Sequence, residues 1–150
     1  MRNARPSPEP LSKQGRTRIY RGPAEWTHWP RLNQALADVT LALEDSGRLA
    51  AEFVLEEWFV NLCTHGQINA GRVLQAMVYW RNTRQDWELL LLDDGLPFDP
   101  TQRSHPDTRA PLAERGKGGM GIYLSLKMTR NNRYERQGPF NAWWLRWHPS

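Results

Sequence analysis

The chain has 150 residues, of which 39% are hydrophobic and 24% are charged, and its formal net charge is +4. This length and composition are typical of one soluble globular domain that can bury a real core. No run approaches the roughly 18 apolar residues of a membrane helix, and the polar, proline-broken start MRNARPSPEP does not resemble a signal peptide. We therefore expect a cytoplasmic protein without membrane association.

The excess positive charge lies at the amino terminus. Residues 1–21 hold six basic residues and one acidic residue, whereas the remainder is about neutral. Four of the first fifteen residues are Pro or Gly, so we expect residues 1–15 to be a disordered basic tail and residues 16–150 to be the folded domain. Because the folded body is nearly neutral, we expect no direct nucleic-acid binding.

The first predicted elements are a strand and an amphipathic helix. A short strand is predicted over residues 16–21, and a helix over residues 29–43. The helix is predicted from four apolar residues at spacings of four, three and four, which place them on one face: Leu32, Leu36, Val39 and Leu43.

The second helix is apolar on nearly all sides and is predicted to be the central helix of the fold. It begins at Ser46 or Gly47 and runs to about His65, and Gly66 is suited to a left-handed cap. The single cysteine, Cys63, lies within it and is expected to be a small buried hydrophobe.

Three polar residues interrupt this apolar helix at one repeat. Glu57, Asn61 and His65 are each four residues apart, so they align along one side of the helix. A carboxylate and a carboxamide among large apolar side chains are costly to bury unless something polar lies beside them. Glu56 is turned by about 100° from Glu57 and is expected at the surface or in a subunit contact.

Two strands are predicted over residues 72–80 and 87–92, and the polar turn RNTRQD joins them as a hairpin. The second strand ends in four consecutive leucines, which indicates a strand buried on both faces. DDGLPFDP follows, and residues 100–117 form a long polar loop punctuated by prolines. Such a loop within a compact domain is typical of a functional lid.

The last third begins with the glycine-rich turn GKGGMG, which leads into a helix with the sequence IYLSLKM. A second hairpin follows, from Tyr134 to residues 143–147, with its turn at residues 137–139. The whole order is strand, helix, helix, strand, strand, lid, helix, strand, strand. This order predicts an α+β two-layer sandwich with a mostly antiparallel sheet covered by about three helices.

Two short motifs have more than one interpretation when each is considered alone. A glycine-rich turn at a helix start lets backbone amides approach an anion, but such turns are also common without a ligand. GKGGMG is not a Walker A loop, because no Gly-Lys-Ser or Gly-Lys-Thr occurs, and it does not directly follow a strand as a Rossmann loop does. Asp93 with Gly95 is a common turn pair as well as a candidate ligand contact.

Taken together, three segments resemble one known arrangement. EEWFVNLCTHG, DDGLPFDP and ERGKGGMGIYL are similar to the three sequence boxes of the Bergerat-type ATP-binding fold shared by gyrase, Hsp90, histidine kinases and MutL. Within that superfamily the chain resembles the anti-sigma factor serine kinases, over about residues 16–147. The resemblance implies the fold, ATP and Mg²⁺ as cofactors, and protein serine kinase activity.

The resemblance also implies roles for individual residues. Asn61 would give its amide oxygen to Mg²⁺, a cation that prefers oxygen ligands, and Glu57 would be the general base that takes the proton of a serine hydroxyl. Asp93 would accept a hydrogen bond from the adenine amino group, and Gly95 would leave room for the base.

Around the triphosphate, the resemblance implies contacts from the glycine-rich turn and from the lid. Gly119 and Gly121 would bring helix amides to the phosphates, and Arg115 or Lys117 would offset their charge. The complete set of residues that the resemblance places there is Lys117, Gly118, Gly119, Met120 and Gly121. One departure concerns the adenine floor, where some members have a threonine and this chain reads Asn141-Ala142-Trp143.

The resemblance finally implies a switch kinase that sequesters a sigma factor and phosphorylates a serine of a small anti-sigma factor antagonist, as a homodimer. We do not expect a sensor histidine kinase, because these 150 residues show no histidine-bearing dimerisation helix pair upstream of the domain. The alternative is a binding module in which ATP only tunes affinity for a partner. We do not expect a simple ATPase, because these residues show no transducer domain after the nucleotide site. Some of the eight tryptophans, such as Trp26, Trp29 or Trp144, mark either a contact surface or the core.

Overall fold

The computed structural model describes residues 15–102 and 119–149. The strands are β1 (Thr17–Pro23), β2 (Gln75–Thr83), β3 (Asp86–Asp93), β4 (Arg130–Gln137) and β5 (Phe140–Trp147). The main helices are α1 (Trp29–Thr40), α2 (Asp45–Asn61) and α4 (Gly119–Met128). Short helical segments are Trp26–His28, Leu62–Gly66, α3 (Gln67–Ala70) and Pro100–Gln102. The predicted tail and most of the predicted lid lie outside the described residues.

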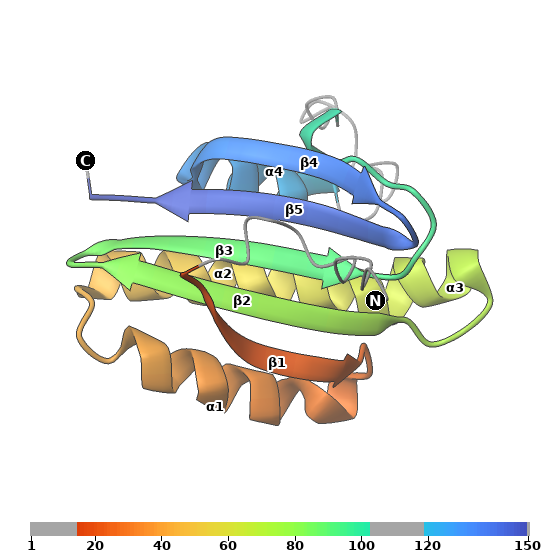
Figure 1. The fold of residues 1–150 in the computed structure, drawn as a ribbon, viewed down its shortest axis with the longest axis horizontal. Helices are drawn as coiled ribbons and strands as arrows, with labels where there is room; N and C mark the ends of the chain where they lie inside the picture. Colours follow the sequence, from red (N-terminus) through yellow and green to blue (C-terminus); the bar gives the residue numbers. More distant parts are fainter. Residues whose placement is uncertain (1–14, 103–118, 150) are drawn as a thin grey trace, which may run out of the picture.

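The five strands form one sheet in the order β1-β2-β3-β5-β4, and each neighbouring pair is antiparallel. Both predicted hairpins are present, with Thr83 paired to Asp86 and Gln137 paired to Phe140. Figure 1 looks onto the sheet with α2 and α4 behind it. The predicted α+β fold with an antiparallel sheet and three main helices is therefore confirmed.

The core lies between the helices and one face of the sheet. Leu32 and Leu36 of α1 are fully buried, as the spacing of apolar residues predicts. In β3, Leu89 and Leu91 belong to this core, whereas Leu90 and Leu92 belong to a second apolar cluster. The strand is thus buried on both faces, as its run of leucines predicts.

The predicted end of the central helix is wrong. Gly66 has a φ of −62°, in the right-handed region, and the chain continues through a π-helical turn at Leu62–Gly66 and then α3. The left-handed cap is Gly71, with a φ of 70°. A Cβ on Gly66 would lie 2.7 Å from Leu74 Cδ1, so glycine at position 66 permits close packing between segments rather than a change of direction.

Other boundaries differ by a few residues. Helix α1 ends at Thr40 rather than residue 43, and the Thr40 hydroxyl donates to the carbonyl oxygen of Leu36 at 2.9 Å. Strand β2 begins at Gln75 rather than residue 72. Helix α2 begins at Asp45, one residue before the predicted start.

The tryptophans divide between surface and interior. Trp26 is 48% exposed, Trp29 is half-buried, and Trp144 is only 7% exposed. Trp26 stacks on Trp29 with ring centroids 5.4 Å apart. Within residues 15–102 and 119–149, none of the helices is long and apolar enough to cross a membrane.

Cys63 is half-buried rather than fully buried. Burial raises the pKa of its thiol to about 11. The thiol is therefore protonated at neutral pH and is a poor nucleophile.

Candidate functional site

One cavity brings together residues that are far apart in the sequence. Its volume is about 540 Å³, and four of the predicted site residues line it: Glu57, Asn61, Asp93 and Gly95. A cavity of this size is typical of small-molecule sites, which span roughly 300–1,000 Å³. His65, the third residue of the polar stripe, lines it as well.

Helix α2 presents Glu57 and Asn61 to the cavity on successive turns. Glu57 is half-buried, whereas its neighbour Glu56 is exposed. Burial raises the pKa of the Glu57 carboxyl above its ordinary value, and the negative charge of Glu56 raises it further. The two adjacent carboxylates thus have different surroundings because the helix turns one of them inward.

The first turn of α4 packs directly against Glu57. A methyl group added to Gly121 would overlap the Glu57 carboxylate. The first amides of a helix have no partner within the helix and carry a partial positive charge. The absence of a side chain at Gly121 therefore lets a carboxylate and a helix amino terminus share one edge of the cavity.

Strand β3 ends at Asp93, which lines the same cavity. Asp93 is 7% exposed, and its Oδ1 accepts hydrogen bonds from the Gly95 amide at 2.9 Å and from Asn141 Nδ2 at 3.0 Å. Burial raises the pKa of Asp93, and these two hydrogen bonds lower it part of the way back. Within the described residues both bonds reach Oδ1, which leaves Oδ2 to accept from a ligand.

Gly95 lies close to the side chains of Asp93 and Leu74. A Cβ at this position would lie 2.9 Å from Asp93 Oδ1 and 2.9 Å from Leu74 Cδ1. The close approach also brings the Gly95 amide to the Asp93 carboxylate. A larger residue at position 95 would therefore force the Asp93 or Leu74 side chain to shift.

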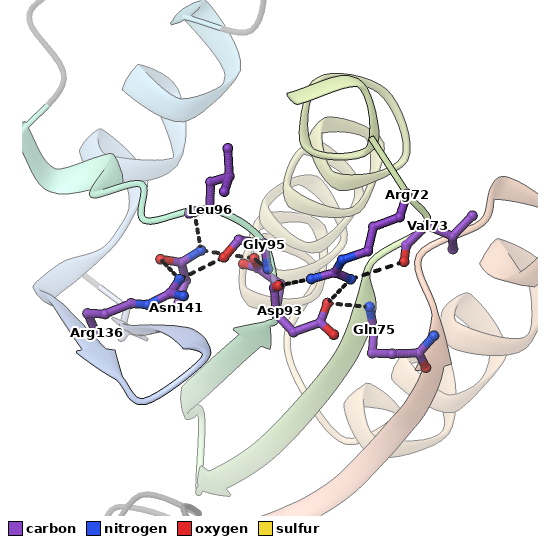
Figure 2. A network of polar contacts seen from close by, with 9 residues as sticks. Arg72, Val73, Gln75, Asp93, Gly95, Leu96, Arg136 and Asn141 are labelled. Carbon is purple, nitrogen blue, oxygen red and sulfur yellow. Dashed lines mark hydrogen bonds and ion pairs between the residues drawn. The ribbon is translucent and has the colours of Figure 1, made fainter. Parts of the chain in front are cut away.

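Asn141 holds this part of the site together, and the sequence analysis did not include it among the site residues. Its Nδ2 donates to Asp93 Oδ1 and, at 2.8 Å, to the carbonyl oxygen of Leu96. Its Oδ1 accepts from the Phe98 amide at 3.1 Å and from the Tyr134 hydroxyl at 2.6 Å. Figure 2 shows Asn141 beside Arg136, with dashed lines to Asp93 and Leu96.

Two features identify this position. In the sequence, Asn141 is a carboxamide next to the apolar run AWWL. In the structure, it is the cross-strand partner of Asp93 in the β3–β5 register. Only the second feature shows what the side chain contacts, since pairing between distant strands is not visible in a local pattern.

Asp94, next to Asp93, faces a different set of partners. Its Oδ1 forms an ion pair with Arg72 Nη1 at 3.1 Å and accepts from the Gln75 amide at 2.7 Å. Arg72 also donates to the Asp94 carbonyl oxygen at 2.6 Å, as part of the network in Figure 2. Asp94 therefore anchors the loop to the start of β2 while Asp93 faces the cavity.

The remaining walls are mostly apolar, with a few polar side chains. They come from the π-helical turn, the loop after β3, helix α4 and the last two strands. The residues include Leu62, Leu74, Leu96, Pro97, Phe98, Ile122 and Trp143, together with Asn69, Ser125 and Tyr134. Apart from the noted departure at residues 141–143, no sequence pattern identifies these walls.

The arrangement fits a ligand with a flat base and a charged tail. Apolar walls with one buried carboxylate suit an aromatic base that carries an amino donor. Asn61, at the end of α2, offers an amide oxygen to the same cavity. Within the described ranges no group of three or more His, Cys, Asp or Glu side chains could hold a metal ion, so Mg²⁺ would need ligand oxygens in addition to Asn61.

The glycine-rich segment is described only in part. Gly119, Met120 and Gly121 form the start of α4, so the predicted helix start is present. Lys117 and Gly118, as well as Arg115 of the predicted lid, lie outside the described residues.

Sequence comparison finds a match to one protein family. A family model described as the histidine kinase-like ATPase domain matches residues 22–147. This range contains every described residue of the cavity. No curated protein matches the chain.

Proposed function

Because the chain belongs to the histidine kinase-like ATPase family, we propose that it is a protein serine kinase of the anti-sigma factor type. Family membership implies ATP binding. The proposal adds the substrate, a serine of a small anti-sigma factor antagonist, and the partner, a sigma factor that the protein sequesters. It also includes a homodimer and a kinase domain that spans residues 16–150.

The observation that carries the proposal is the position of Glu57. It is half-buried at the cavity, packed against the first turn of α4, and the pKa of its carboxyl is raised. A raised pKa makes a carboxylate a stronger base towards a hydroxyl proton. A protein that only binds a nucleotide does not need such a base.

Each residue has a distinct part in the proposed reaction. Asp93 holds the base of the nucleotide through a hydrogen bond from an amino group, and Asn61 supplies an oxygen to Mg²⁺. Bound Mg-ATP supplies the transferable phosphoryl group. Glu57 would take the proton of the serine hydroxyl as the serine oxygen bonds to the γ-phosphorus of ATP. The bond from that phosphorus to the β–γ bridging oxygen would break and release ADP, and the amides near Gly121 would stabilise the negative charge.

The test uses purified protein, ATP labelled in the γ-phosphate, and candidate antagonist proteins. Glu57→Gln should bind ATP but lose transfer by about 100-fold or more, the usual size of a general-base effect. Glu56→Gln is the matched control, because its carboxylate is exposed, and it should retain transfer. Full transfer by Glu57→Gln would remove this residue from catalysis.

The same assay separates kinase from binding module. If the wild-type protein transfers no label while ATP changes its affinity for a sigma factor, the protein is an ATP-dependent binding module. Co-purification of partners with and without ATP measures that change.

A further inference from the structure

A cluster of arginines lies on the sheet face opposite the helices. Arg81, Glu88 and Arg146 are cross-strand neighbours on β2, β3 and β5. They alternate along their strands with Trp80, Trp87 and Leu145 of the helix-side core, so they lie on the other face. This is the face seen in Figure 1 with the helices behind it.

One carboxylate serves several guanidinium groups there. Glu88 forms ion pairs with Arg16 Nη2 at 3.5 Å, with Arg146 Nη2 at 3.4 Å, and with Arg81. The Glu88 side chain is 17% exposed and that of Arg16 is 9% exposed. Among the described residues, positive charge therefore exceeds negative charge around Glu88. The side chains of Arg81 and Arg146 are more exposed, at 39% and 45%, so a further anion could reach this partly desolvated region and would be favourable there.

The surroundings of Arg16 show the same imbalance. Burial lowers the pKa of its guanidinium below the ordinary value, and Glu88 offsets only part of this effect. The positive charges of Arg81, Arg133 and Arg146 lower the pKa further.

Two buried donors in this region lack acceptors. Arg16 Nε and Trp144 Nε1 have no hydrogen-bond partner in the described part of the chain. Buried donors are almost always paired in folded proteins. The Arg133 guanidinium lies over the Trp144 ring, 4.1 Å from its centroid, and thus adds a further cation beside this indole.

Arg16 and Trp144 both line one cavity of about 340 Å³, which we call the arginine pocket. Its lining is Arg16, Glu88, Asn131, Arg133, Trp144, Leu145 and Arg146. None of the described residues lines both this pocket and the cavity that contains Glu57 and Asp93, which is the proposed nucleotide cavity. At about 30 Å³ for each water molecule, the volume also exceeds what one or two waters would fill.

We propose that the arginine pocket binds an oxyanion, either a carboxylate or a phosphate group. Guanidinium groups match the geometry of both groups through paired N–H donors. The oxyanion accepts from Arg16 Nε and the Trp144 indole, and it balances the cations that Glu88 leaves uncompensated. The inference does not depend on the proposed kinase activity, since the two cavities are separate.

The test is a titration of the full-length protein with sodium phosphate and, separately, with sodium acetate, each at constant ionic strength maintained with chloride. The readout is the NMR signal of the Trp144 indole N–H, assigned with Trp144→Phe. A saturable shift is expected, and the more effective anion identifies the preferred group. No saturable shift with either anion would overturn the proposal.

Three variants make the test specific. Arg16→Gln should weaken binding about tenfold, the loss of one charge-assisted contact. Arg18→Gln, an exposed arginine of β1 that lies two residues from Arg16 and outside the pocket, should leave affinity unchanged. Glu88→Gln should tighten binding several-fold by freeing the guanidinium groups, a gain that misfolding cannot produce. Equal affinities for Arg16→Gln and Arg18→Gln, or weaker binding by Glu88→Gln, would contradict the proposal.

Discussion

Glu56 and Glu57 are adjacent in the sequence but differ in exposure, and this difference has a measurable consequence for pH dependence. Glu57 must be ionised to accept a proton, and the pKa of its carboxyl is raised by burial and by Glu56. Phosphoryl transfer should therefore be lost, as pH falls, at a higher pH than an ordinary glutamate would give. The sign follows from the raised pKa, because the inactive protonated form persists further towards neutral pH.

Glu56→Gln tests this cause directly. Removing the neighbouring negative charge should lower the pKa of Glu57, so the acid limb of the rate profile should move to lower pH. Because Glu56 is exposed, the displacement should shrink as salt is added. Glu52→Gln is the control, since Glu52 is not among the groups that shift Glu57. An unchanged profile for Glu56→Gln at low salt would contradict the electrostatic explanation.

At the scale of elements, the contact between α2 and α4 determines the geometry of the proposed base. Gly121→Ala adds a methyl group where the Glu57 carboxylate lies, so either the side chain or the helix must move. A displacement of about 1 Å can cost roughly 100-fold in rate, and we expect a loss of transfer of that size. Alanine is otherwise the better helix former by about 1 kcal/mol, so loss of the helix itself is not expected.

The measurement is transfer of labelled phosphate, together with circular dichroism to verify that α4 persists. Leu124→Ala is the matched control on the same helix, because Leu124 is 39% exposed and does not line the cavity. Wild-type activity of Gly121→Ala would show that the contact with Glu57 is not needed for catalysis.

At the scale of the whole molecule, binding of Mg-ATP should stabilise the folded protein against unfolding. Mg-ATP at about 100 times its dissociation constant should raise the free energy of unfolding by about 2.7 kcal/mol. For a chain of this size, that corresponds to a rise in melting temperature of roughly 5 to 10 °C. Thermal unfolding followed by tryptophan fluorescence measures it.

Asp93→Ala should abolish most of this stabilisation at the same ATP concentration, because the buried acceptor for the base is lost. Asp86→Ala is the control at the other end of the same strand, where the side chain is exposed. If Asp93→Ala retains the full shift with Mg-ATP, then Asp93 does not hold the nucleotide.

The sequence by itself determined the order of the elements and much of the candidate site. The spacing of Leu32 and Leu36 predicts α1, and the four leucines of β3 predict a strand buried on both faces. Helical spacing also places Glu57 and Asn61 together, since residues four apart lie on one face of any α-helix. The resemblance of three segments to one family then links these residues to Asp93 and Gly95, and all four line one cavity.

Only the tertiary structure decided the features that depend on contacts between distant segments. The central helix passes Gly66 because that glycine packs against Leu74, and Asn141 reaches Asp93 because β3 and β5 pair in one register. The arginine pocket likewise assembles residues of β3, β4 and β5 with Arg16, which lies just before β1. Strand register and side-chain packing are set by the whole chain at once, so no local pattern contains them.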